Sequence, residues 1–200
     1  MGKFLDKAYG VKTADDVRRL YDDWSGSYDA EITQAGYATP GRIAAALVGA
    51  GADTSQPILD YGCGTGVSGA ALKAAGFSVV DGVDLSAEML ARAEPKGLYR
   101  NLSLAGPEDP VPGGYGTLAA IGVIGLGAAP LALLDRMVAA MPGGALFGLS
   151  LNDHTLEDPA YPGRLDTLAS DGTVRVIFEE HGPHLPGIGI GSRVYVLERT

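Results

Sequence analysis

The segment from Ile58 to Gly66 constrains the fold of this chain more than any other part of the sequence. Four strand-like residues lead into glycines at every second position, and a helix-like stretch begins at Val67. Because glycine has no Cβ, such a turn can bend sharply and let a ligand approach its backbone. Eighteen residues beyond Gly66, a second apolar run ends at Asp84. A strand, a glycine turn, a helix and a second strand that ends in an acid predict half of a nucleoside-cofactor site.

Size and composition favour one domain over residues 1–200, with a helical cap in residues 1–50 and a sheet core in residues 56–200. No segment has the ~20 uninterrupted apolar residues that cross a bilayer, and the N-terminus lacks an apolar run of signal-peptide length. We therefore expect a cytoplasmic protein without membrane contact. The formal charge of −9 argues against nucleic acid, because its phosphates need cationic contacts. The histidines and the single cysteine lack zinc-type spacing, so no metal site is expected.

The spacing of apolar residues predicts helices that alternate with strands. Two short helices are expected on either side of Gly26, the first capped by Thr13, and a third helix is expected with Thr39 as its cap. Strands are expected over residues 58–61, 77–84, 99–104, 117–124, 146–151, 173–180 and 193–198. The stretch 181–192 holds two prolines and four glycines, so a loop between antiparallel strands is expected there. The pattern predicts an α/β fold with a mostly parallel seven-stranded sheet between helices and one antiparallel strand near the C-terminus.

Two cofactors compete for the glycine loop. Read from Gly64, the loop matches GxGxxG with Asp84 twenty residues on, which favours NAD. Read from Asp60 as DxGxGxG, it resembles motif I of the class I S-adenosylmethionine (SAM)-dependent methyltransferases. Residues 83–90 resemble the second motif of that family, and residues 141–146 resemble its "LKPGG" turn, in family order and spacing. The aromatic stretch 21–29 is similar to the small Williams–Beuren-region-type members, so the resemblance favours SAM.

The resemblance implies a three-layer, Rossmann-like methyltransferase fold that binds SAM and releases S-adenosylhomocysteine (SAH). Asp60, or the backbone near it, would face the methionine ammonium, and Asp84 would accept hydrogen bonds from the ribose hydroxyls. The residues expected at the cofactor are Trp24, Tyr28, Asp60, Gly62, Gly64, Asp84, Leu85, Met89, Gly106 and Ile121. Alternatives stay open: Asp84 could cap the following helix, and Met89 and the aromatic helical stripe could be ordinary core.

Three positions depart from the family pattern. Gly106 stands where many relatives carry an Asp that reaches the adenine amino group, so that contact would pass to Glu108 or to a backbone group. Tyr115-Gly116 replaces an aromatic-Asp pair at the start of the fourth strand, a change that concerns packing. The stretch 122–127 has no acid, base or amide, whereas families that methylate amide nitrogens carry a polar tetrapeptide there.

These features predict a methyltransferase (class 2.1.1.-) that acts on a small-molecule acceptor, as a monomer or a dimer. A general base is needed only if the acceptor must lose a proton, and His154 is the candidate, although a lone loop histidine can simply be exposed. A non-catalytic SAM-binding protein is one alternative. The other is an NAD-dependent oxidoreductase, for which no tyrosine-lysine pair at catalytic spacing is present.

Overall fold

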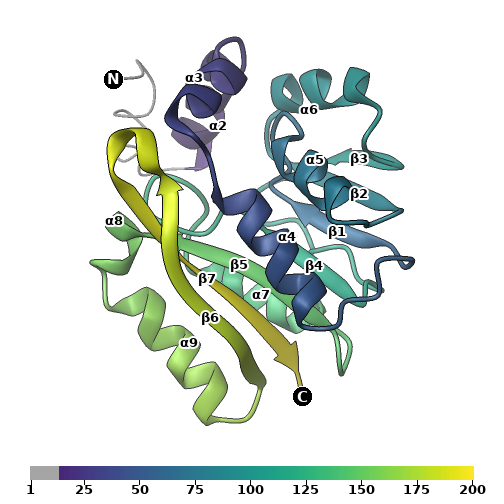
Figure 1. Ribbon diagram of the computed structural model, residues 1–200, viewed down its shortest axis with the longest axis vertical. Coiled ribbons are helices and arrows are strands. Elements are labelled where there is room, and N and C mark those ends of the chain that lie inside the picture. Colours follow the sequence, from purple (N-terminus) through teal and green to yellow (C-terminus); the bar gives the residue numbers. More distant parts are fainter. Residues whose placement is uncertain (1–13) are drawn as a thin grey trace.

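The computed structural model describes residues 14–200, and its centre is a seven-stranded sheet in the order β3-β2-β1-β4-β5-β7-β6 (Figure 1). The strands are β1 (Ile58–Tyr61), β2 (Val80–Asp84), β3 (Asn101–Leu104), β4 (Thr117–Ala120), β5 (Leu146–Asn152), β6 (Val174–Leu185) and β7 (Ile190–Arg199). The first five pair in parallel, whereas β7 lies between β5 and β6 and runs antiparallel to both. A dinucleotide-binding sheet has the order 3-2-1-4-5-6, so the inserted β7 does not support NAD.

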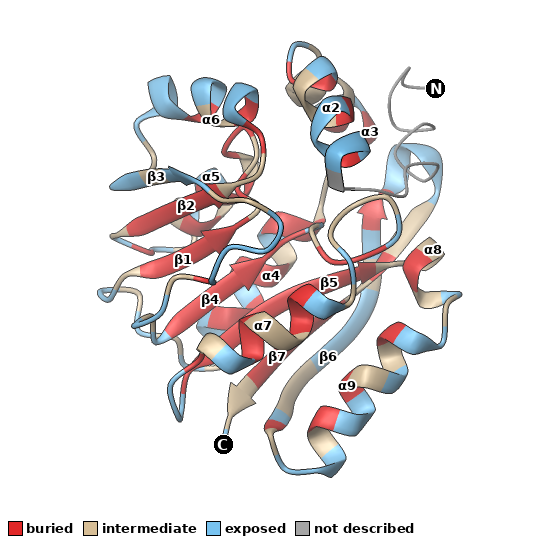
Figure 2. Cartoon of the chain, turned by 180° about the vertical axis from the view of Figure 1, so that it is seen from behind, coloured by how far each residue is buried: buried red, intermediate tan, exposed pale blue. Residues whose placement is uncertain are grey.

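Helices cover both faces of this sheet, which gives the three expected layers (Figures 1 and 2). The helices are α2 (Ala14–Trp24), α3 (Tyr28–Ala35), α4 (Thr39–Gly49), α5 (Val67–Ala74), α6 (Ala87–Ala93), α7 (Ala132–Ala140), α8 (Asp153–Leu156) and α9 (Ala160–Ser170), with short 3-10 turns η1 (Glu94–Lys96) and η2 (Pro186–Ile188). The apolar sides of α4 and α5 form one buried core with the sheet, and those of α7 and α9 form the other. No helix among residues 14–200 is long and apolar enough to cross a membrane.

The N-terminal helices α2 and α3 lie above the carboxyl edge of the parallel strands rather than against a sheet face. They occupy the space between α6 and the tip of the β6–β7 hairpin (Figures 1 and 2). Trp24 and Ile32 from these helices form a small separate core with Leu185 from the hairpin. The cap therefore connects both ends of the edge where ligands bind in folds of this type.

Several predictions of local structure are confirmed, and others are wrong. The helices on either side of Gly26 and the single antiparallel strand are present, whereas the expected cap at Thr13 lies outside the described residues. The cap of α4 is Ala38 and not Thr39, whose hydroxyl bonds to the hairpin instead. The expected strand over 117–124 ends at Ala120. Residues 181–192 are largely strand and not loop, because β6 and β7 continue their pairing almost to η2.

Candidate functional site

The glycine loop after β1 is shaped by close packing against the loop after β4. Gly62 has φ +75°, and a Cβ added there would lie 2.3 Å from Cγ2 of Val123, so only glycine fits this position. The amides of Gly62 and Cys63 donate to the carbonyl of Val83, at 2.7 and 3.0 Å. These bonds hold the loop against the end of β2, which brings Gly64 beside Asp84.

Asp84 connects the glycine loop with the start of α6. Its Oδ2 accepts the amide of Gly64 at 2.7 Å, and its Oδ1 accepts the amide of Ser86 at 2.9 Å. Desolvation raises the pKa of Asp84 above its ordinary value, although these backbone bonds oppose the rise. The cap of α6 is Ser86, whose hydroxyl accepts the amide of Met89. Asp84 therefore organises the backbone here and also lines a cavity, so its two suggested roles do not exclude each other.

Asp60 lies beneath the glycine loop and is fully buried. Its Oδ2 accepts the hydroxyls of Ser68 at 2.6 Å and Tyr99 at 2.8 Å, whereas its Oδ1 has no hydrogen-bond partner among the described residues. Burial raises the pKa of Asp60 to about 6, against the effect of the two hydroxyls. Asp60 is not among the residues that line the cavity. It supports the loop from below and keeps one buried acceptor unused.

Two carboxylates fasten the N-terminal helices over this region. Asp22 of α2 accepts the hydroxyl of Ser86 at 2.5 Å, at the first turn of α6. Asp29 of α3 accepts the hydroxyl of Thr65 in the glycine loop at 2.5 Å and pairs with Nζ of Lys96 at 2.6 Å. The cap is thus bonded directly to the loop and to the helix that carry the predicted cofactor residues.

A cavity of about 450 Å³ opens in front of the glycine loop and Asp84. Eight of the predicted cofactor residues line it, namely Tyr28, Gly62, Gly64, Asp84, Leu85, Met89, Gly106 and Ile121. Glu108 lines it too, and the amide of Gly106 donates to Oδ2 of Asp109 at 2.7 Å. Most of the wall is apolar, with Arg18 and Arg136 as its basic side chains. The structure thus brings together most of the residues that the sequence suggests.

A second, smaller cavity of about 70 Å³ adjoins the first and shares part of its wall, including Tyr28 and the glycines of the loop after β4. Trp24 lines this smaller cavity and not the larger one. Its ring packs against Tyr21 and Tyr28, with centroid distances of 5.8 and 4.7 Å. Desolvation, followed by the neighbouring Tyr37, raises the pKa of Tyr28 well above its ordinary value, so this hydroxyl stays neutral.

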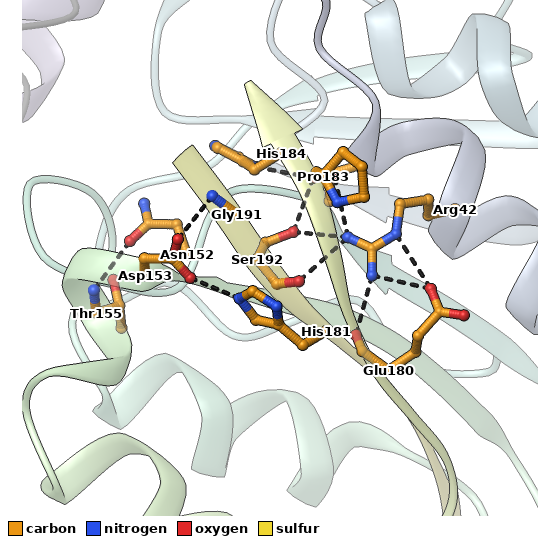
Figure 3. A network of polar contacts seen from close by, with 11 residues as sticks. Arg42, Asn152, Asp153, Thr155, Glu180, His181, Pro183, His184, Gly191 and Ser192 are labelled. Atoms are coloured by element: carbon orange, nitrogen blue, oxygen red, sulfur yellow. Dashed lines mark hydrogen bonds and ion pairs between the residues drawn. The ribbon is translucent and has the colours of Figure 1, made fainter. Parts of the chain in front are cut away.

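The histidines do not lie where the sequence suggests. His154, the predicted base, lies on α8 and lines neither cavity. His181 is exposed on β6 and pairs through Nε2 with Asp153 at 2.7 Å (Figure 3). His184 is the histidine that lines the smaller cavity, beside Asn152. The Pro- and Gly-rich stretch 181–192 predicts a loop, which makes His184 a weaker candidate than His154, but β6 continues to Leu185 and β7 begins at Ile190.

The departure at Tyr115 has a structural explanation at the other end of the sheet. Its hydroxyl donates to Oδ2 of Asp81 at 2.8 Å, and Asp81 also accepts Nε of Arg100 and Nδ2 of Asn101, both at 3.0 Å. This cluster near the start of β2 is away from both cavities. The change at Tyr115 therefore concerns packing and polar satisfaction, as the sequence indicates.

Comparison with known proteins agrees with these features. A family model described as a methyltransferase domain matches residues 58–105. Methyltransferase-like protein 27 of Homo sapiens is 34% identical over 143 residues, which make up 68% of this chain and 58% of that protein. The chain therefore spans less than two thirds of the length of this curated relative.

Solved structures show the same fold at low identity. A magnesium protoporphyrin IX methyltransferase from Synechocystis PCC 6803 with bound SAH has a TM-score of 0.64 at 16% identity, over 92% of this chain and all of that chain. The [4+2]-cyclase SpnF has a TM-score of 0.68 at 12% identity, over 94% and 97% of the two chains. The matches confirm the resemblance that the motifs indicate: this chain has the fold of the class I SAM-dependent methyltransferases, and SAM is the cofactor of that class.

Proposed function

We propose that this protein is a SAM-dependent methyltransferase whose acceptor is a small molecule. One observation carries the proposal: the cavity lined by the glycine loop and Asp84 shares part of its wall with a second, aromatic cavity that has polar groups of its own. Two adjoining cavities match a reaction that needs two ligands in contact. Alignment of donor and acceptor supplies much of the acceleration in such a displacement.

The residues present fit SAM as the first ligand. Gly64 lines the cavity, and no atom lies within 4 Å of the position that a Cβ would take there, so a ligand can rest on its backbone. Asp84 lines the same space, and each of its oxygens, which accepts one backbone amide, retains a lone pair for a ribose hydroxyl. Leu85 and Met89 add apolar wall for an adenine ring. The unused buried Oδ1 of Asp60 supplies negative charge under the loop, where a methionine ammonium would lie.

When bound, SAM supplies a sulfonium-linked methyl group, which passes to a nucleophilic atom of the acceptor while the C–S electron pair returns to sulfur, leaving SAH and, from a protonated acceptor, a proton. The protein itself binds the two ligands, aligns them and covers the cavity that holds them. The bonds of Asp22 to Ser86 and of Asp29 to Thr65 hold α2 and α3 over the cavity. Covering the cavity excludes water and places Tyr28 against both ligand spaces.

The wall of the two cavities favours a small, partly apolar acceptor. The loop after β4 contributes glycine, alanine and aliphatic residues, and the cap contributes aromatic rings. The net charge of −9 opposes a nucleic-acid acceptor. We infer a free metabolite of the cytoplasm, with at least one face apolar enough to pack against Tyr28.

The adenine contact is proposed to pass from the family's Asp position, Gly106, to Glu108 or to a backbone group. Glu108 lines the cavity next to Gly106, whereas Asp109 is occupied by the amide of Gly106. If Glu108 takes this role, Glu108→Ala should weaken SAM binding about fivefold, since one hydrogen bond to an amino group is lost. Unchanged affinity in calorimetry would assign the contact to the backbone.

The function is tested by binding and then by transfer. Thermal-shift titrations with SAM, SAH, NAD and NADP should show stabilisation by SAM and SAH alone. Incubation with methyl-labelled SAM and a library of small carbonyl, phenol and amine compounds should then give a labelled product, and Asp84→Ala should abolish the signal. Stabilisation by NAD alone would overturn the proposal.

A second outcome has to be separated from the first, because one protein with this fold is described as a cyclase. A protein that binds SAM tightly but transfers no label to any acceptor would be a non-catalytic SAM-binding protein or an enzyme of another reaction. The two experiments together separate a methyltransferase from such a protein, because SAM binding alone satisfies the thermal-shift experiment, whereas the transfer experiment also requires an acceptor that reacts.

A further inference from the structure

The smaller cavity combines aromatic walls with three polar side chains. Its polar lining comes from Ser150 and Asn152 at the end of β5 and from His184 on β6. It adjoins the larger cavity at Tyr28 and at the loop after β4. A ligand in the larger cavity can therefore extend one polar group into it.

His184 is directed into this cavity by an irregularity of the hairpin. Pro183 pairs with Gly191 and Leu185 pairs with Ile190, so His184 is the extra residue of a β-bulge. Bulges re-aim a side chain, and they are frequent beside active sites. The carbonyl of His184 accepts the amide of Ala38 at 2.9 Å, and its ring meets Tyr37 edge-on at 5.1 Å. The first contact holds the backbone of His184 in place, and the second packs against its ring.

A chain of hydrogen bonds determines which nitrogen of His184 carries the proton. Nη1 of Arg42 lies 3.1 Å from Oγ of Ser192, that oxygen lies 3.0 Å from Oγ1 of Thr39, and the latter lies 2.8 Å from Nδ1 of His184 (Figure 3 shows the arginine, serine and histidine). Ser192 and Thr39 are completely buried, so each hydroxyl proton needs a partner within the protein.

Only one direction of donation satisfies every group in this chain. Arginine can only donate, so Ser192 accepts from Arg42 and donates to Thr39, which in turn donates to Nδ1 of His184. In the reverse direction, Ser192 would accept twice and its own buried proton would have no partner among the described residues. Nδ1 is therefore an acceptor, and the proton of the neutral ring sits on Nε2, which has no other partner among residues 14–200.

The ring stays neutral at physiological pH. Burial lowers the pKa of His184 to about 4, and this effect outweighs the opposite effect of Asp153; the charge of Arg42 adds a still smaller lowering. A neutral imidazole with its proton on Nε2 donates a hydrogen bond into the cavity and has no free lone pair there. It is a binding group for an acceptor atom and not a base.

Asn152 adds a second donor on the same side of the hairpin (Figure 3). Its Oδ1 accepts the amide of Thr155 at 2.9 Å, which fixes the orientation of the side-chain amide, and its Nδ2 protons have no acceptor among residues 14–200. Ser150 accepts the amide of Gly122 at 3.0 Å, and its hydroxyl proton has no acceptor within the described part of the chain, so it can donate to a ligand. The polar lining of the cavity therefore presents donors.

We propose that this cavity binds a hydrogen-bond-accepting oxygen of the methyl acceptor, a carbonyl or a carboxylate, through Nε2–H of His184 and Nδ2–H of Asn152. This inference rests on the proposed function, because it names the substrate group recognised at the same site. Thr39, Ser192 and Arg42 are positioning residues that hold His184 in its donor form.

The tautomer can be measured without any ligand. Two-dimensional NMR of protein labelled with ¹⁵N-histidine distinguishes a protonated nitrogen from an unprotonated one in each ring, with His184 assigned by the variant His184→Gln. The proposal predicts a proton on Nε2, an unprotonated Nδ1, and no titration between pH 6 and 8. A proton on Nδ1, or a cationic ring at pH 7, would overturn it. This measurement does not depend on whether the protein methylates anything.

The ligand chemistry is tested with matched probes on protein saturated with SAH. Acetophenone and benzoate carry an oxygen on a group small enough for the cavity, and α-methylstyrene has the shape of acetophenone without the oxygen. We expect at least tenfold weaker binding of α-methylstyrene than of the better oxygen probe, with shifts of the His184 and Asn152 resonances only for the oxygen probes. Equal binding of acetophenone and α-methylstyrene, or no binding of either oxygen probe, would reject the inference.

Variants connect this preference to His184. His184→Phe removes the donor and keeps a ring, so it should abolish the oxygen preference, whereas His184→Gln keeps an N–H donor and should retain most of it. His181→Phe is the control outside the cavity and should change nothing. SAH affinity should be equal in all of these variants. Failure of SAH to bind the wild-type protein would contradict the proposed function, whereas an oxygen preference that survives His184→Phe would contradict this inference alone.

Discussion

β2 carries one aspartate near its start and another at its end, and the two are held in opposite ways. Asp81 is paired with Arg100 and accepts hydrogen bonds from Tyr115 and Asn101. Burial works to raise the pKa of Asp81, but its three partners outweigh this effect and leave the pKa below its ordinary value. Among the described residues, Asp84 has no ion-pair partner and accepts hydrogen bonds only from backbone amides, and its pKa is raised.

The difference separates, within one strand, an acid whose partners belong to the protein from an acid that lines the larger cavity. At the start of β2, the buried carboxylate oxygens of Asp81 accept hydrogen bonds from donors of the protein, which offsets the cost of burying them. At the end of β2, the hydrogen bonds of the Asp84 carboxylate beside the cavity only partly offset its desolvation. Asp60 in the neighbouring strand has an oxygen with no partner among the described residues. Such groups lower the stability of the ligand-free protein. Asp84 lines the cavity and is available to donors of a ligand, whereas Asp60 lies outside the cavity wall.

The largest expected effect comes from removing the acid at the ligand end. Asp84→Ala should weaken SAM binding about 100-fold or more, because two charge-assisted hydrogen bonds to ribose hydroxyls are lost, each worth roughly 1.5–3 kcal/mol. Calorimetric titration with SAH measures the change. If the affinity falls less than threefold in a folded variant, Asp84 does not hold the ribose and the contrast within β2 loses its functional meaning.

The pH dependence of stability should have opposite signs for Asp60 on β1 and for Asp81 on β2. Because the folded pKa of Asp60 is about 6 and the unfolded value is about 3.9, the contribution of Asp60 to the unfolding free energy falls as pH rises from about 4 to about 6. The full difference is about 2–3 kcal/mol at 1.36 kcal/mol per pKa unit. Asp81, with a lowered pKa, contributes stability that is present at neutral pH and is lost as pH falls below about 4.

Urea unfolding of wild type and Asp60→Asn at several pH values between 4 and 7 isolates the first contribution. Asparagine keeps an oxygen for Ser68 and Tyr99 but cannot ionise. The variant should therefore lack the decline in stability between pH 4 and 6 that Asp60 causes. If the unfolding free energies of the two proteins change in parallel with pH, ionisation of Asp60 does not lower the stability and the prediction is wrong.

Asp81→Asn should lower stability without touching ligand binding. The side chain is buried and its partner Arg100 is half exposed, so we expect a loss of about 2 kcal/mol in unfolding free energy. SAH affinity should remain within twofold of wild type, because the cluster lies away from both cavities. An affinity loss as large as that of Asp84→Ala would mean that the two ends are coupled.

The smallest effect concerns the cap, which covers only the ligand end. Asp29→Asn weakens the bond to Thr65 and removes the ion pair with Lys96, a partly exposed contact worth about 1 kcal/mol. SAH should therefore dissociate about fivefold faster, as measured by stopped-flow displacement. Asp23→Asn makes the same change of charge at an exposed position of α2 and serves as the control. Equal rates in both variants would argue against a fastened cap.

The sequence predicts the cofactor half of this molecule far better than the acceptor half. Local residue patterns predict β1, the glycine turn and the strand that ends at Asp84, because strand, turn and helix signals follow one another there within a short stretch. The hairpin does not: its Pro- and Gly-rich residues resemble a loop, yet Arg42 of α4 bonds to the carbonyls of Glu180, Pro183 and Ser192 and supports them as strands. His184 and Thr39 meet only through this long-range packing, which no local pattern reveals.

Under the proposed role of His184, the bulge makes the length of β6 a determinant of which acceptor the protein binds. Deleting His184, the residue between Pro183 and Leu185, would restore regular pairing with β7 and remove the imidazole from the cavity, while every contact of the glycine loop stayed in place. Substrate choice could thus diverge among relatives through gains and losses of single hairpin residues. Homologues with different spacing between α9 and the C-terminus are therefore the proteins in which to look for different acceptors.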